Sequence, residues 1–154
     1  MNRSPLLIDT FCKSAAAILI FSGLAKIISE FSGVRLLEIE DPLIALSYRE
    51  MFWIAGPIET LVGLFLFSSV STWIKLVLVC FLSGNFLMYR CGLWLMKAGK
   101  TCPCLGTLTD WIPINHSIIE KLMFLTSIYL FAVGGLLAMV ERRRMMARPA
   151  IYAK

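Results

Sequence analysis

The sequence predicts an all-α membrane protein, a single domain built as an up-down bundle of four transmembrane helices. Of the 154 residues, 58% are hydrophobic and only 16% are charged, a balance too apolar for a soluble domain. The apolar residues gather into four runs of about 17 residues or more, the length that crosses a bilayer. The tryptophans fall at the ends of these runs or in the loop before the last one, as in membrane-interface belts: Trp53, Trp73, Trp94 and Trp111.

The first predicted helix covers residues 10–31. Its charged residues are Lys13, Lys26 and Glu30, and each stands where a long side chain could reach an interface. Residues 32–50 are polar and acidic and are expected outside the membrane. The second helix covers residues 51–67.

Helix two contains Gly56-Pro57, where a kink is expected, and Glu59 is its only charge. The serine-rich connection after it is short, so helices two and three should be antiparallel neighbours. The third helix covers residues 73–96 and contains Arg90.

A loop at residues 97–117 follows helix three and carries Cys102-Pro103-Cys104 and the only histidine, His116. The fourth helix is expected at residues 118–140. The run Glu141-Arg142-Arg143-Arg144 should end it and begin a basic tail at residues 141–154.

Basic residues near the helix ends set the orientation through the positive-inside rule. One side of the predicted bundle has eight of them: Arg3, Lys13, Lys75, Arg142, Arg143, Arg144, Arg148 and Lys154. The other has five: Arg35, Arg49, Lys97, Lys100 and Lys121. We therefore expect a multi-pass protein of the cell membrane with both termini in the cytoplasm and the cysteine loop outside it. The net charge of +5 comes without a basic groove, so nucleic acid is not an expected partner.

Cys102 and Cys104 are the candidate catalytic residues. Two thiols one residue apart can form and resolve a mixed disulfide within the same loop. Pro103 restricts the backbone, so the two Cα atoms should lie roughly 6–7 Å apart, at the far edge of bondable separation. A strained disulfide of this kind is typical of redox-active sites, and the oxidising extracytoplasmic side can sustain it. A structural disulfide or two unreactive thiols are the alternatives.

The other cysteines have weaker claims to chemistry. Cys91 stands beside Arg90 and could be a third redox thiol, although a small core residue is the favoured interpretation. Cys12 and Cys80 are expected in the core. Cys91, Cys102, Cys104 and His116 together have poor spacing for zinc, so no metal site is expected.

Lys26, Glu59 and Arg90 form the predicted supporting charge cluster. At 1.5 Å per residue, Glu59 lies roughly 12 Å from the outer end of helix two and Arg90 roughly 25 Å from the inner end of helix three. All three therefore fall in the outer half of the bundle, and Glu59 should pair with Lys26 or Arg90. In the structural alternative, the two cations reach lipid head groups and only Glu59 is paired.

These motifs together resemble the MauE branch of the DoxX-like four-helix membrane proteins. The resemblance covers about residues 10–140, and its elements appear in the family's order: Gly23-Leu24-Ala25-Lys26, Asp41-Pro42, Pro57-Ile58-Glu59, Gly63-Leu64, Arg90, and Cys102-Pro103-Cys104-Leu105-Gly106. Pro103 and Leu105 differ from the usual Cys-Gly-Cys-Phe-Gly form.

The resemblance implies extracytoplasmic thiol-disulfide exchange, or maturation of disulfide-containing partner proteins, as MauE is associated with methylamine dehydrogenase maturation and the methylamine metabolic process. We expect a redox-associated protein in which electrons leave through the membrane to a quinone. A non-enzymatic membrane assembly or transport factor with a structural cysteine loop is the alternative, and a lipid or small-molecule carrier is a third hypothesis. The expected partners are the lipid bilayer and an extracytoplasmic thiol or disulfide protein.

Overall fold

The computed structural model describes residues 4–31, 35–96 and 116–147. The described chain contains four α-helices and a 3₁₀ turn, and apart from an isolated bridge between Glu40 and Ser47 it has no β-structure. The helices are α1 (Ser4–Glu30), α2 (Tyr48–Phe65), α3 (Thr72–Leu95) and α5 (His116–Ala147), and η1 covers Arg35–Glu38. The all-α prediction is confirmed.

Three helix boundaries differ from the sequence prediction by three residues or more. α1 begins at Ser4, six residues before the predicted start at residue 10, because proline is tolerated in the first turn of a helix and Leu6, Leu7 and Ile8 extend the apolar run. α5 does not stop at Glu141 but continues to Ala147, so the prediction that the arginine run ends it is wrong. Arginine and glutamate are good helix formers, and Arg144 lies 3.7 Å from Glu141 one turn back, which supports the helix beyond the apolar run. α2 begins three residues early because Ser47 and Glu50 form a reciprocal capping box.

Three helices of the described chain are long and apolar enough to cross a membrane. The spans are Leu6–Glu30, Thr72–Leu95 and Ile118–Met146. Many large apolar side chains on them face outward, as a lipid environment requires; Phe21 and Phe81 are more than 60% exposed. α2 is not among the three, because its 18 residues include Arg49, Glu50 and Glu59.

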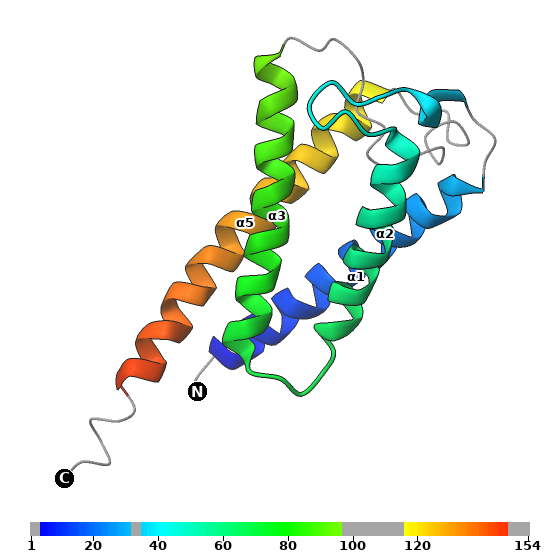
Figure 1. The fold of residues 1–154 in the computed structure, drawn as a ribbon. Helices are drawn as coiled ribbons and strands as arrows, with labels where there is room; N and C mark the ends of the chain where they lie inside the picture. The colour runs from blue at the N-terminus through cyan, green and yellow to red at the C-terminus, as the bar shows by residue number, and fades with distance from the viewer. Residues whose placement is uncertain (1–3, 32–34, 97–115, 148–154) are drawn as a thin grey trace.

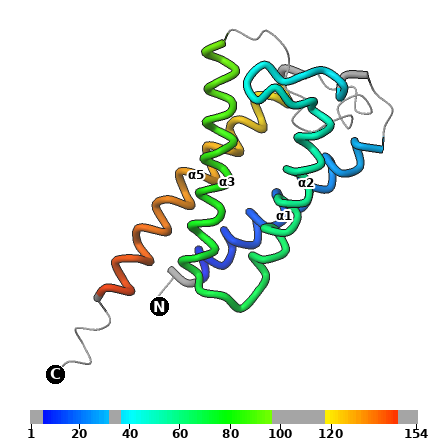
Figure 2. The backbone as a smooth tube through the Cα atoms, in the orientation of Figure 1, coloured from blue at the N-terminus to red at the C-terminus, as the bar shows by residue number. Residues whose placement is uncertain are grey.

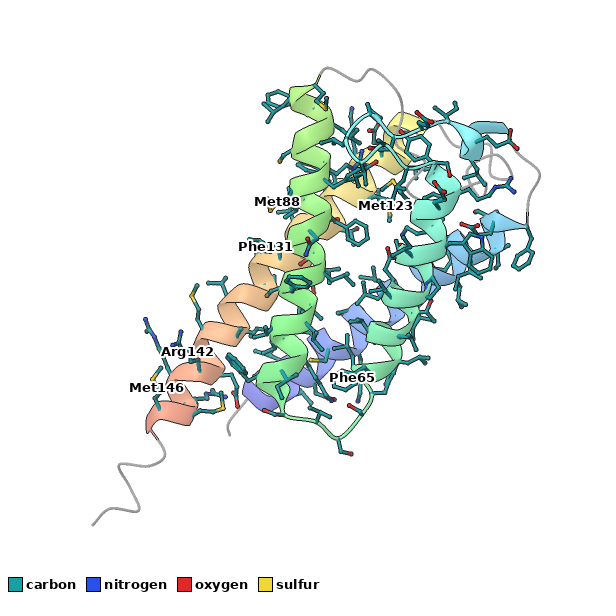
Figure 3. The ribbon with its side chains drawn as sticks, in the orientation of Figure 1. Phe65, Met88, Met123, Phe131, Arg142 and Met146 are labelled. Carbon is teal, nitrogen blue, oxygen red and sulfur yellow. The ribbon has the colours of Figure 1, made fainter. Side chains whose placement is uncertain are left out.

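The helices pack as two pairs, α1 with α2 and α3 with α5, and the two pairs touch each other much less. Figure 1 shows the described N-terminal end, the α2–α3 connection and the C-terminal end of α5 on the same side of the molecule. The 35–47 segment, the end of α3 and the start of α5 gather at the opposite end, as the tube in Figure 2 makes clear. Figure 3 shows Arg142 and Met146 on the last turns of α5, away from α2.

Glycines bring α1 and α2 into close contact. A Cβ atom on Gly23 would lie 2.4 Å from Oγ1 of Thr60 and 2.7 Å from the carbonyl oxygen of Gly56. Gly63 stands seven residues after Gly56 on α2, and a Cβ atom there would lie 2.7 Å from Cγ1 of Ile20. Small residues at such positions let two membrane helices approach until their backbones almost touch. The close approach places the next side chains along α1 and α2 directly opposite each other.

Candidate functional site

A buried ion pair joins α1 to α2 just beyond the glycine contact. Lys26 Nζ lies 2.7 Å from Glu59 Oε2, and the two side chains are only 5% and 1% exposed. The prediction that Glu59 pairs with Lys26 or Arg90 is confirmed for Lys26. The alternative in which Lys26 extends to lipid head groups is wrong, because its ammonium is enclosed between the two helices.

The ammonium of Lys26 has further partners inside the protein. It donates to Ser22 Oγ at 2.8 Å, one turn earlier on α1, and lies 5.3 Å from the centre of the Phe86 ring on α3. Glu59 is less well satisfied: its second oxygen, Oε1, is buried and accepts no hydrogen bond from the described residues. A buried carboxylate oxygen without a donor is costly, which makes this atom the most conspicuous feature of the site.

Arg90 has a different partner from the one the sequence prediction considered. Its Nη1 donates to Oε1 of Glu120 at 2.6 Å, and its Nη2 donates to the main-chain oxygen of Glu120 at 3.0 Å. The pair links α3 to α5 as Lys26 and Glu59 link α1 to α2. The predicted cluster therefore consists of two ion pairs, one within each helix pair.

Asp41 holds the loop before α2 against α3. Its Oδ1 accepts from the main-chain N–H groups of Leu43 and Ile44 at 2.8 and 3.2 Å, and its Oδ2 accepts from the hydroxyl of Tyr89. Asp41 is 1% exposed. This fully buried carboxylate ties the two helix pairs together at the end of the bundle where α3 finishes, next to Arg90.

A cavity of about 380 Å³ lies between the two helix pairs, and all four helices contribute to its wall. Its polar side includes Ser22, Lys26, Glu59, Tyr89 and Arg90. Most of the wall is apolar or aromatic: Ile18, Leu19, Met51, Phe52, Ala55, Val79, Leu82, Phe86, Met123 and Leu130 belong to it. Figure 3 shows Met123 on α5, beside α2. A mainly apolar pocket with a few convergent polar groups is the usual form of a small-molecule site.

The cysteines divide into those the structure describes and those it does not. Cys102 and Cys104 lie outside the described residues, as does the side chain of His116. Cys12 is buried in the core, as predicted, and Cys80 is half-buried between α3 and α5, close to Gly134. Cys91 is exposed, so the interpretation of it as a core residue is wrong. Its position on α3, one residue after Arg90, turns it away from the α5 interface.

Sequence reasoning missed two of the polar residues at this end. Glu120 was not considered because it stands next to the cysteine loop, where a carboxylate is ordinary. Its position four residues after the start of α5, at the same end of the bundle where α3 finishes after Arg90, is the signal that could have found it. Tyr89 gave no signal, since a tyrosine at a membrane interface is expected on general grounds.

Neither a protein-family model nor a curated protein nor a solved structure matches this chain. The class that the fold and the cavity define is therefore an all-helical protein with at least three membrane-capable helices and an internal, mainly apolar cavity.

Proposed function

We propose that the chain is a multi-pass membrane protein that takes part in extracytoplasmic thiol-disulfide exchange through Cys102 and Cys104. In this proposal α2 crosses the membrane as the fourth helix. The ion pair with Lys26 supports a membrane-crossing α2, because it compensates the one charge in the apolar part of that helix. The resemblance of the sequence motifs to the MauE branch of the DoxX-like proteins supports the same function.

The observation that carries the proposal is the place where the cysteine segment joins the bundle. Residues 97–115 connect the end of α3 to the start of α5. Arg90 stands five residues before the end of α3, and Glu120 stands four residues after the start of α5. The two side chains form an ion pair with each other. The two ends of the segment that carries the cysteines therefore lie within two helical turns of the Arg90–Glu120 ion pair, and Arg90 belongs to the polar side of the cavity.

The proposed reaction begins with a partner dithiol attacking the Cys102–Cys104 disulfide. A mixed disulfide forms between the partner and Cys102, and Cys104 leaves as a thiolate. The partner's second thiol then displaces Cys102, which completes the partner's disulfide and leaves both loop cysteines reduced. Two electrons and two protons pass to a membrane quinone, which becomes a quinol as the Cys102–Cys104 disulfide forms again.

Non-reducing gels on single-cysteine variants test this proposal. A Cys104→Ser variant keeps the Cys102 thiol, which can run the last exchange step in reverse by attacking the disulfide of the oxidised partner. Without Cys104 the loop cannot resolve the mixed disulfide, so a covalent adduct should accumulate. A Cys91→Ser variant is the matched control and should form no adduct. If the loop disulfide resists a mild dithiol in the folded protein and no variant traps a partner, the cysteines are a structural clip and the protein is an assembly factor.

Labelling with an impermeant thiol reagent tests the proposed orientation. With both termini in the cytoplasm, reduced Cys102 and Cys104 should react in intact cells while buried Cys12 does not. Labelling of the loop only after permeabilisation would place it on the cytoplasmic side and remove the oxidising compartment.

A small-molecule carrier is the second candidate function, and the cavity favours it. A volume of about 380 Å³ is within the range of ligand pockets, and its wall is formed by all four helices rather than by a surface groove. A carrier would keep its ligand-binding ability when both loop cysteines are replaced by serine, whereas the exchange function would be lost.

A further inference from the structure

Several polar side chains of the cavity wall donate hydrogen bonds to backbone carbonyl groups of their own helix. Ser83 Oγ donates to the carbonyl of Val79 at 2.7 Å, and Asn85 Nδ2 donates to that of Phe81 at 2.8 Å. Ser127 Oγ donates in the same way one turn back along α5, at 2.9 Å. Each oxygen keeps lone pairs that can accept. The neutral polar groups of the wall therefore offer acceptors to an occupant.

The cationic groups in the wall also donate hydrogen bonds to acceptors of the protein itself. Lys26 donates to Ser22 and to Glu59 Oε2, and Arg90 donates to Glu120. Glu59 Oε1 is the reverse case, a buried carboxylate oxygen with no donor among the described residues. A carboxylate is a stronger acceptor than a hydroxyl or an amide, so this atom should dominate the choice of ligand. This unsatisfied acceptor favours a ligand that brings a hydrogen-bond donor.

The rest of the wall determines the body of the ligand. Phe52, Phe86, Tyr48 and the thioether of Met51 line the cavity beside the apolar side chains. Aromatic edges and methionine sulfur pack well against a planar ring. The size of the cavity suits a ring with a short apolar substituent.

Lateral access from the lipid phase is consistent with the exposure of the lining residues on α2. Ile54 and Ile58 line the cavity and yet are 56% and 45% exposed on the outer surface of the bundle. Contacts between α2 and α3 are few, so these two helices are not packed tightly against each other beside the cavity. A ligand dissolved in the bilayer could enter there with its apolar part leading.

We propose that the cavity binds a lipid-soluble molecule with a ring-bearing apolar body and a hydroxyl group that donates a hydrogen bond to Oε1 of Glu59. Membrane quinols and simple lipophilic phenols share this chemistry. For a quinol, the inference rests on the proposed function, in which a membrane quinone takes the electrons; for a phenol, it stands without it.

The choice of a donor has a consequence for a bound redox couple. A quinol carries hydroxyl donors, whereas the oxidised quinone carries only acceptors. A hydrogen bond to a charged acceptor should favour the reduced form roughly ten- to hundredfold. For a two-electron couple, this raises the reduction potential of the bound quinone by about 30–60 mV, which makes it a better oxidant of dithiols.

Binding measurements on the full-length protein in lipid nanodiscs test the inference. The probes are decylhydroquinone, its oxidised form decylbenzoquinone, and 4-decylphenol, which has the donor without the redox chemistry. We expect saturable binding of the hydroquinone and the phenol, and binding of the benzoquinone that is at least tenfold weaker. A hydroquinone that binds more tightly than the phenol would identify a quinol as the ligand, and equal affinities would identify the phenol class. Equal binding of all three probes would overturn the inference.

Two substitutions on α2 form a matched pair for this test. Ala55 lines the cavity, and Ala55→Phe should fill part of it and abolish saturable binding of the phenol. Leu61 is on the same helix, outside the cavity lining and 65% exposed, so Leu61→Phe should bind like the unchanged protein. Equal losses in the two variants would show that the probes bind elsewhere. An unchanged protein that shows thiol exchange but no saturable probe binding would refute this inference alone, whereas probe binding without thiol exchange would refute the proposed function alone.

Discussion

Glu59→Gln tests the buried ion pair directly, because it removes one charge and changes the side-chain volume very little. Lys26 would remain 4% exposed, with Ser22 and the Phe86 ring as its nearest partners. Breaking a buried pair by removing one partner costs about 3–5 kcal/mol, since the other charge stays buried without compensation. The free energy of unfolding should fall by this amount, which lowers the folding equilibrium constant by about two to four powers of ten.

Equilibrium unfolding in mixed micelles of increasing dodecyl sulfate content, followed by circular dichroism, measures the effect. Glu38→Gln is the control: Glu38 is 70% exposed and 4.0 Å from Arg49, so its loss should cost no more than about 1 kcal/mol. A double variant, Lys26→Met with Glu59→Gln, should regain most of the lost stability because no unpaired charge remains. Equal unfolding midpoints for Glu59→Gln and Glu38→Gln, or a double variant less stable than Glu59→Gln alone, would refute the reasoning.

Three further predictions concern the helix contact, the loop and the α2 cap. Gly23→Ala should lower the free energy of unfolding by about 1–3 kcal/mol in the same assay, whereas Gly135→Ala, which has open space around it, should be neutral or stabilising. Tyr89→Phe leaves Asp41 without one donor and should speed amide exchange in the loop before α2 at a stability cost of about 1–3 kcal/mol. Hydrogen bonds from the N-cap backbone and hydroxyl hold the pKa of Glu50 below its usual value of 4.5. Because the pKa of Glu50 is lower in the folded state, the stability that its ionised form contributes is complete above pH 4.5 and disappears as the pH falls through the folded-state pKa. Glu50→Ala should remove that part of the acid dependence of the unfolding midpoint. An unchanged acid dependence would contradict this prediction.

The sequence was sufficient to predict where the helices lie and that Glu59 has a cationic partner. Hydropathy and length mark the runs, and the rise of 1.5 Å per residue gives the depth of each charge along its helix. Depth alone left Lys26 and Arg90 as the two possible partners of Glu59, and the glycine contact between α1 and α2 in the structure decides for Lys26. Depth is a property that a sequence carries locally.

The sequence did not predict the partner of Arg90, because that partner depends on how α3 is rotated about its axis. Arg90 is at a depth similar to that of Glu59, but the face of α3 that carries it turns toward α5 and not toward α2. Which neighbour a helix face meets is decided by the rotation and pairing of the helices, and a single sequence does not determine these. The same reason accounts for Cys91, whose exposure depends on the same rotation of α3.

The end of α5 was mispredicted for a different reason. The arginine run marks the end of the apolar layer, and the prediction treated it as the end of the helix as well. Hydrogen bonding along the backbone continues past the bilayer boundary wherever the side chains favour helix, as Glu141 and Arg144 do.

The two helix pairs are two consecutive helical hairpins, α1 with α2 and α3 with α5. The interface inside each hairpin is extensive, and the one between the hairpins is sparse and encloses the cavity. Only the short turn between Phe65 and Thr72 joins α2 to α3. In the proposed topology with α2 as the fourth membrane helix, each hairpin enters the bilayer as its own insertion unit during synthesis, and docking of the two hairpins is the last step. A chain severed in that turn should therefore reassemble from co-expressed halves, and the interface along which the halves meet is the one that contains the cavity.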